Sequence, residues 1–132
     1  MKTSSLAEIG EAHKGGFFGT KIQDVLDDTV VSLTLPCQSG TYILNTGTTR
    51  YPYPEGQALL FIDSGSSSSI GVTNIGSAAG KIEGVNDTPL DGTTGDDGKI
   101  TVNVNDDSRI LQIENRIGVT THFTLTSLAL MY

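Results

Sequence analysis

Short apolar clusters recur about every ten residues from Thr29 onward, and turn residues separate them. Val31, Leu33 and Leu35 alternate with polar residues until Pro36 ends the run, which is the period-two pattern of a strand with one buried face. Gly, Ser, Thr, Asn and Asp fill the spaces between clusters, and these residues are typical of turns and sheet surfaces. The pattern predicts an all-β chain.

Seven further strands are expected from the same pattern. They are predicted at 41–45, 57–63, 68–74, 80–85, 99–105, 109–114 and 121–130. About eight strands is the number typical of a jelly roll, so we expect a jelly-roll-like antiparallel sandwich over residues 29–132. In the last strand Phe123 and Leu125 share one face, whereas Leu128 and Leu130 fall on the other. This change of phase predicts either a bulge near Thr126 or apolar contacts on both faces.

Residues 1–28 differ from the rest and are expected to form a partly helical arm. Ser5 with Glu8, and Thr20 with Gln23, have the capping-box spacing of a helix start. The second segment, 21–27, carries apolar residues at i, i+3 and i+4, which predicts a short helical turn with one apolar stripe. Since such a short helix gains stability by packing onto something else, we expect the arm to dock on a partner. Removal of residues 1–20 is expected to leave a folded domain that no longer binds that partner.

Charge and cysteine content exclude several classes of protein. The 132-residue chain is the size of one domain, and its formal charge of −7 repels phosphate backbones, so we expect no nucleic-acid partner. Cys37 is the only cysteine, so no disulfide forms within the chain. Neither a signal-peptide pattern nor an apolar stretch of membrane-spanning length is present. The chain is therefore expected to fold in the cytoplasm of the cell that makes it, away from membranes.

Asp63 carries the one enzymatic hypothesis that the sequence suggests. The run from Leu59 through Asp63 to Ser66 resembles the active-site signature of aspartic proteases, in which an apolar strand delivers an aspartate into a Ser-Gly turn. In a homodimer of the retroviral type, Asp63 would share a proton with its twin. The downstream part of that signature is weak, because Arg116 leads the only nearby candidate, Arg116-Ile117-Gly118. The simpler interpretation is that Asp63 ends a buried strand and the chain turns at Ser64-Gly65.

Metal and nucleophile sites are not favoured. The loop with Asp87, Asp91, Asp96 and Asp97 has the oxygen ligands that calcium prefers, but its spacing matches no calcium-loop motif and indicates a solvated acidic loop. His13 and His122 lack a second ligand at metal spacing. Cys37 has no basic neighbour that would activate its thiol. We therefore predict no catalytic, cofactor or metal site.

Tyr42, Tyr51 and Tyr53 admit two interpretations. Tyrosine offers a wide contact area with a polar tip, so these rings could stack on a sugar or contact another protein. They could equally shield one end of the sandwich.

The carboxyl-terminal third carries a resemblance to a known group of proteins. A strand leads into Ile113-Glu114-Asn115-Arg116-Ile117-Gly118, and a closing strand with Phe123-Thr124-Leu125-Thr126 follows. This segment resembles the end of many tailed-phage virion structural proteins, among them capsid decoration proteins, head fibres and tail fibres. The resemblance implies a small β-sandwich that often trimerises. From the residues themselves, Asn115 and Gly118 suit a β-turn, and Glu114 and Arg116 could pair with each other or with a neighbour.

The sequence thus favours a non-enzymatic virion structural protein. We expect a capsid decoration or head-fibre protein, made in the host cytoplasm, that associates with itself as a homotrimer. It would bind the major capsid protein or another virion protein. A receptor- or carbohydrate-binding fibre tip and a retroviral-like protease that uses Asp63 are the alternatives.

Overall fold

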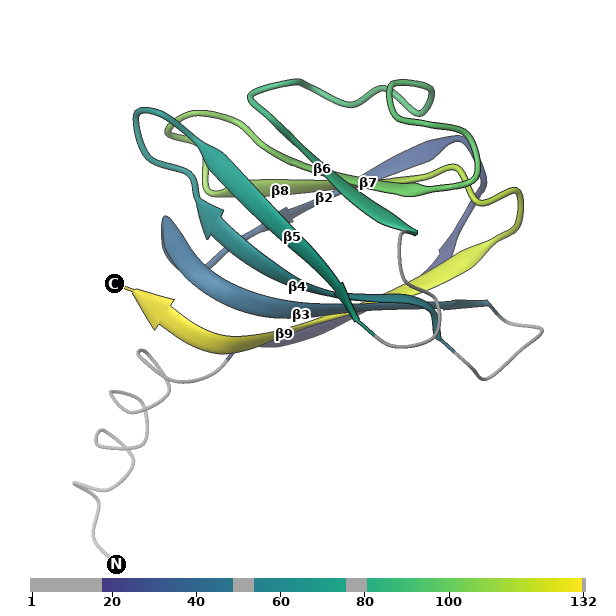
Figure 1. Cartoon of the computed structure of the whole chain (residues 1–132), viewed down its shortest axis with the longest axis horizontal. Coiled ribbons are helices and arrows are strands. Elements are labelled where there is room, and N and C mark those ends of the chain that lie inside the picture. The colour runs from purple at the N-terminus through teal and green to yellow at the C-terminus, as the bar shows by residue number, and fades with distance from the viewer. Residues whose placement is uncertain (1–17, 49–53, 76–80, 132) are drawn as a thin grey trace, which may run out of the picture.

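The computed structural model describes residues 18–48, 54–75 and 81–131, which form nine strands in two stacked sheets and contain no helix (Figure 1). The strands are β1 (Gly19–Val25), β2 (Thr29–Thr34), β3 (Ser39–Thr48), β4 (Pro54–Asp63), β5 (Ser69–Ile75), β6 (Ile82–Asn86), β7 (Ile100–Val104), β8 (Ile110–Asn115) and β9 (Thr121–Met131). The eight strands expected from the alternating pattern are all present, and β1 is additional. The prediction of an all-β sandwich is confirmed.

The two sheets differ in strand order and in strand direction. The first sheet has the antiparallel order β1-β9-β3-β4-β5. Within it β3, β4 and β5 follow one another and β9 returns to lie beside β3, which is the strand order of a Greek key. The second sheet has the order β2-β8-β7-β6, and its β6 and β7 run parallel. The sandwich is therefore mostly, but not wholly, antiparallel.

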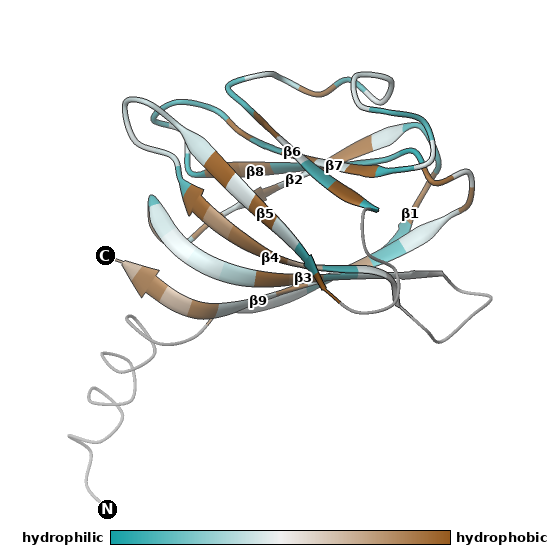
Figure 2. Ribbon diagram, in the orientation of Figure 1, coloured by the Kyte–Doolittle hydropathy of each residue, from teal (hydrophilic) through white to brown (hydrophobic). Residues whose placement is uncertain are grey.

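The core lies between the two sheets and is built from alternate residues of each strand. In the first sheet the largest fully buried side chains are Tyr42, Leu44, Leu60, Phe123 and Leu125. In the second sheet they are Ile100, Val102, Val104, Leu111 and Ile113. The same alternation appears as brown and pale segments along β5 (Figure 2). Burial of these side chains is the main favourable contribution to folding.

The helical turn expected at residues 21–27 is wrong, because this segment forms β1 and pairs with β9. A bulge lies between Ile22 and Val25, and Asp24 within it has a φ of 57°. The bulge lets Ile22 and Val25 both pack against the core although they are three residues apart. Three-residue spacing also suits one face of a helix, which explains the error. The sandwich thus includes residues that the sequence placed in the arm, while the capping box at Ser5 lies outside the described residues.

The phase change expected in the last strand is confirmed as a bulge. Thr41 pairs with Ala129 and the next residue, Tyr42, pairs with Ser127, so Leu128 is the inserted residue. Leu128 is 54% exposed, whereas Leu130 returns to the core with 7% exposure. The bulge therefore turns one large apolar side chain out of the sandwich.

Candidate functional site

The outer side of the five-stranded sheet carries an apolar surface. Phe61, Leu128 and Met131 are exposed by 47%, 54% and 67%. Ile43 and Leu59 are cross-strand neighbours on this side and are half-buried. We call these five residues the apolar face. Exposed apolar side chains gathered on one side of a sheet make the apolar face a candidate contact surface.

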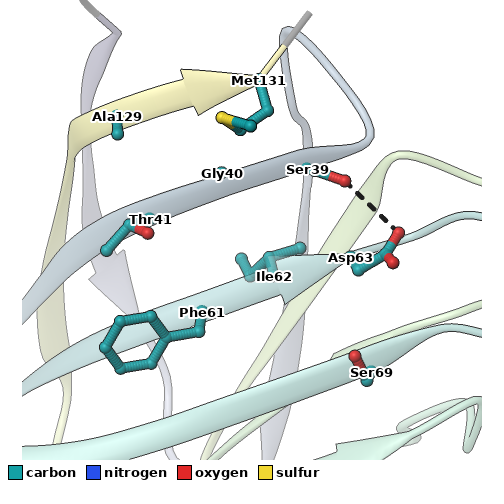
Figure 3. A pocket seen from close by; sticks show the side chains of 9 residues that line it. All are labelled: Ser39, Gly40, Thr41, Phe61, Ile62, Asp63, Ser69, Ala129 and Met131. Atoms are coloured by element: carbon teal, nitrogen blue, oxygen red, sulfur yellow. Dashed lines mark hydrogen bonds between the residues drawn. The ribbon is translucent and has the colours of Figure 1, made fainter.

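A shallow hollow of about 300 Å³ lies at the Met131 end of the apolar face (Figure 3). Phe61 forms one wall and Ala129 and Met131 form the other. The residues that line the hollow are Ser39, Gly40, Thr41, Phe61, Ile62, Asp63, Ser69, Ala129 and Met131. Asp63 is the only ionisable residue among them. The described residues of the hollow thus combine an aromatic ring, hydroxyl groups and one carboxylate.

Asp63 ends β4 at the edge of this hollow. One of its carboxylate oxygens accepts a hydrogen bond from the Gly65 N–H at 3.0 Å. The same oxygen accepts a bond from the Ser39 hydroxyl at 3.4 Å (Figure 3). Ser64 is buried, and its hydroxyl donates to the Gln38 carbonyl. The predicted strand end and turn at Ser64-Gly65 are confirmed. The protease hypothesis stays a prediction, which Asp63→Ala would test.

The Asp-rich connection from β6 to β7 runs over the outside of the second sheet (Figure 1). Its carboxylates bond both within the loop and to the connection between β7 and β8. Asp91 accepts hydrogen bonds from the Thr93 N–H and from the hydroxyls of Thr93 and Thr94, and these bonds lower its pKa. Asp87 accepts a bond from the Asp106 N–H. Among the described residues, no group of three His, Cys, Asp or Glu is placed to hold a metal ion.

Glu114 is fully buried beneath this connection. Its carboxylate accepts hydrogen bonds from the backbone N–H groups of Gly92 at 2.8 Å, Thr94 at 3.1 Å and Gly95 at 2.7 Å. A buried carboxylate is stable when several donors replace the water that it loses. Glu114 therefore pins the loop to β8. The sequence could not reveal this role, because the partners are backbone groups.

The side chains of Arg116 and Asn115 bond to the neighbouring segments around the end of β8. The Arg116 guanidinium donates to Asp28 at 3.0 Å and to the Gly95 carbonyl at 2.6 Å. The hydrogen bond with Asp28 raises the pKa of Arg116. The Asn115 side chain donates to the carbonyls of Val25 and Val119. Of the two predicted alternatives for Glu114 and Arg116, the structure therefore shows pairing with neighbours.

The turn after β8 has the glycine that its backbone requires. Gly118 has a φ of 101°, which glycine adopts without the strain that other residues suffer. Its N–H donates to the Asp27 carboxylate at 2.8 Å. The predicted β-turn role of the glycine is confirmed.

The other residues considered from the sequence lie apart from the hollow or outside the described residues. Tyr42 is buried in the core, where its ring meets Phe18 edge-on at a centroid distance of 6.3 Å. Cys37 is buried and its thiol donates to the Ser39 carbonyl. His122 is half-buried on β9. Tyr51, Tyr53 and His13 lie outside the described ranges. The ring of Tyr42 is therefore not available to a sugar or to another protein.

Comparison with known proteins gives no relative. The chain matches no protein-family model, no curated protein sequence and no solved structure. In residues 18–48, 54–75 and 81–131 there is also no helix with the length and apolarity needed to cross a membrane.

Proposed function

We propose that the chain is a virion structural protein of a tailed phage, of the capsid decoration or head-fibre type. It associates with copies of itself, as a homotrimer if the resemblance holds, and binds the major capsid protein or another virion protein. Synthesis takes place in the host cytoplasm, and the finished protein resides in the virion. In this proposal the chain is not an enzyme.

The observation that carries the proposal is the apolar face. A side chain such as Met131, 67% exposed and lining the same hollow as Phe61, loses its contact with water when another protein covers it. Each square ångström of apolar area removed from water contributes about 25 cal/mol, which offsets part of the freedom that the subunits lose on association. This is the chemistry of a protein that works by packing against other subunits.

Two further features support the proposal. The segment that resembles phage virion proteins runs through β7, β8, the turn at Gly118 and β9, and so connects the second sheet to the first. Glu114, Asn115 and Arg116 in this segment hold neighbouring loops in place. The Greek-key order of β9, β3, β4 and β5 is also a part of a jelly-roll-like fold, which we propose for the sandwich as a whole.

Virions of the phage that encodes the chain provide the direct test. Quantitative mass spectrometry of purified particles is expected to find the chain in a fixed copy number relative to the major capsid protein. Antibody-gold labelling is expected to place it on the capsid. Absence of the chain from washed virions would refute the proposal, and labelling of the tail alone would refute the capsid assignment.

The arm proposal needs a shorter deletion than the sequence suggested. Removal of residues 1–20 would cut into β1, which starts at Gly19, and would weaken the first sheet. Deletion of residues 1–16 leaves Phe18, whose N–H donates to the Ser127 hydroxyl at 2.7 Å. We expect this variant to stay folded and to lose capsid binding, and full binding would refute the docking role.

A fibre tip that binds a sugar is the second candidate, and the hollow favours it. Sugars stack on aromatic rings and bond to carboxylates, and the hollow offers Phe61 beside Asp63. Glycan-array binding that disappears on both Phe61→Ala and Asp63→Asn would support this function. Silent arrays with the wild-type chain would exclude it.

A further inference from the structure

The two sheets have four edge strands, and their edges are protected to different degrees. The edges are β1 and β5 in the first sheet and β2 and β6 in the second. An edge strand presents unpaired backbone N–H and C=O groups, and proteins guard such edges with charges, bulges or side chains that cap the backbone. An edge that lacks these devices is a place where another strand can add.

The edges of β5 and β6 are closed by asparagine side chains. The Asn74 side chain accepts a bond from the Ile82 N–H at 3.0 Å and donates to the Ile82 carbonyl at 2.9 Å. The Asn86 side chain accepts a bond from the Ile70 N–H at 2.8 Å. These bonds join the two sheets along one side of the sandwich. Neither strand therefore offers a regular free edge.

The β1 edge is interrupted by a bulge and by charge. Its pairing with β9 shifts between Ile22 and Val25, and Asp24 has a φ of 57°. Lys21 and Asp24 are exposed on the strand. Both features disfavour the addition of a further strand.

From Val30 to Thr34 the β2 edge has none of these protections, although Asp28 just before the strand has a φ of 56°. Its sequence, Thr-Val-Val-Ser-Leu-Thr, contains no charge and no proline, and its pairing with β8 is regular from Thr29 to Thr34. The Leu35 N–H donates to the Arg109 carbonyl at 2.7 Å, which fixes the hydrogen-bonding phase of the pair. In an antiparallel ladder of this phase, Val30, Ser32 and Thr34 direct their backbone groups away from β8. The outward-directed backbone groups of these three alternate residues are thus available to pair with another strand.

Opposite charges lie at the two ends of this edge. Asp28 precedes β2, is exposed, and forms an ion pair with Arg116 of its own chain at 3.0 Å. At the other end Arg109 is exposed, and its guanidinium donates to the Pro36 carbonyl at 3.2 Å. Arg109 has a φ of 53°, a conformation that costs a residue with a long side chain about 1–2 kcal/mol. None of the ion pairs formed by the described residues includes Arg109.

We propose that two copies of the chain pair through β2 in antiparallel fashion, so that their four-stranded sheets join into one. The phase of the ladder allows a two-fold axis at Ser32. In this register Val30 lies opposite Thr34 of the second copy, and Val31 lies beside Leu33 of the second copy. Asp28 then lies opposite Pro36 of the second copy, where that copy's Arg109 is anchored.

The β2 pairing names one surface for the self-association proposed above, and its biological role rests on that proposed function. The β2 edge shares no residue with the apolar face, so the two contacts can form independently. A contact through the apolar face and a contact through β2 would together build an assembly larger than either alone.

Ser32→Lys tests the pairing by light scattering. Ser32 is exposed and lies on the proposed axis, so the substitution brings two like charges together while leaving the isolated sandwich intact. We expect the particle mass to fall to half and the dissociation constant of the pair to rise at least tenfold. Ser66→Lys, the same change in an exposed turn, is the matched control and is expected to keep the wild-type mass. An unchanged mass for Ser32→Lys would overturn the proposal.

A cross-link provides a second measurement that does not depend on disruption. In a Cys37→Ser background, Ser32→Cys places two thiols across the axis with Cα atoms about 5.5 Å apart, within disulfide range. Rapid oxidation to a covalent dimer is expected, whereas Ser66→Cys should form no covalent dimer. Failure to cross-link would overturn the pairing, including the case in which residues 1–17 cover this edge. Detection of the chain in virions is a separate result, so failure of the pairing and failure of the proposed function are distinguishable.

Discussion

Glu114 shows how one side chain organises a long connection. The residue lies on β8 beside the turn that ends at Gly118, yet its carboxylate bonds to backbone N–H groups in the loop between β6 and β7. Arg116, two residues on, binds the carbonyl of Gly95 in the same loop. Glu114 thus binds backbone N–H groups of the loop, and Arg116 binds one of its carbonyl groups.

Glu114→Gln is expected to destabilise the sandwich. The amide keeps the shape of the side chain but turns an N–H₂ group toward backbone donors, so at least one N–H loses its acceptor in a buried place. The expected loss in the free energy of unfolding is about 2–4 kcal/mol, measured by urea denaturation. Glu83→Gln is the control, because Glu83 also bonds to this loop, at the Asp96 N–H, but is only partly buried. Equal losses for the two variants would contradict the account.

The pH dependence of stability follows from the carboxylates that accept hydrogen bonds. A bond from the Ser68 N–H lowers the pKa of Asp106, and bonds from Thr93 and Thr94 lower that of Asp91. The folded-state pKa of each carboxylate is thus below its unfolded value, which is near 4. Above the unfolded pKa each carboxylate contributes fully to the free energy of unfolding, and this contribution is lost as the pH falls through the folded-state pKa. We expect the urea concentration at the midpoint of unfolding to decrease as the pH is lowered below about 4.

Asp106→Asn isolates one part of that dependence. Asparagine keeps an oxygen that can accept the Ser68 N–H, but it does not titrate. The variant is therefore expected to lose less stability than the wild type between neutral and acid pH. A steeper acid loss in the variant would show that the Asp106 carboxylate does not act as described.

At the scale of elements, the loop between β6 and β7 depends on close approach of the backbone. Gly92 has a φ of 105°, and a Cβ there would collide with the Asp28 carbonyl oxygen and lie 3.1 Å from the Asp28 carbonyl carbon. Gly98 has a φ of 85°, but a Cβ there meets nothing within 4 Å. The two glycines share a backbone conformation and differ in the space around them.

Gly92→Ala and Gly98→Ala separate these two effects. Gly98→Ala is expected to cost about 1–2 kcal/mol in the free energy of unfolding, from backbone strain alone. Gly92→Ala adds a collision with backbone and is expected to cost about 2 kcal/mol more. Urea denaturation of the two variants checks the difference. Similar losses would mean that the loop moves away from Asp28 freely.

The strands of the sandwich could be predicted because their pattern is local. Alternation at Val31, Leu33 and Leu35 needs no knowledge of the partner strand. β1 was missed because its bulge gives Ile22 and Val25 the spacing of a helix face. The Greek-key order and the parallel pair of β6 and β7 depend on contacts between distant residues, which periodicity does not encode.

The candidate site was only partly predictable. The place of Asp63 at a strand end followed from the turn residues after it, but the hollow also needs Met131 and Ser69 from other strands. The apolar face did leave a signal, because Ala58 to Ile62 is a continuous apolar run on an antiparallel strand, which predicts apolar side chains on both faces. The burial of Glu114 left no signal in the sequence.

At the scale of the whole molecule, the apolar face lies on the outside of a sheet whose inner side is already packed. Phe61 and Leu128 contribute little to the core, so their exposed area is free to stabilise contacts between molecules. Leu128→Asp is expected to leave the urea midpoint nearly unchanged and to weaken self-association. Val119→Asp changes an apolar residue with 47% exposure elsewhere on the surface and serves as the control.

The mass of the purified chain in solution tests the central claim most directly, which is that the molecule works by assembly. Light scattering over a range of concentrations is expected to give more than one chain per particle. Leu128→Asp should lower that mass, whereas Val119→Asp and Asp63→Ala should not change it. A wild-type mass of a single chain at every concentration, or a mass that Leu128→Asp leaves unaltered, would contradict the account.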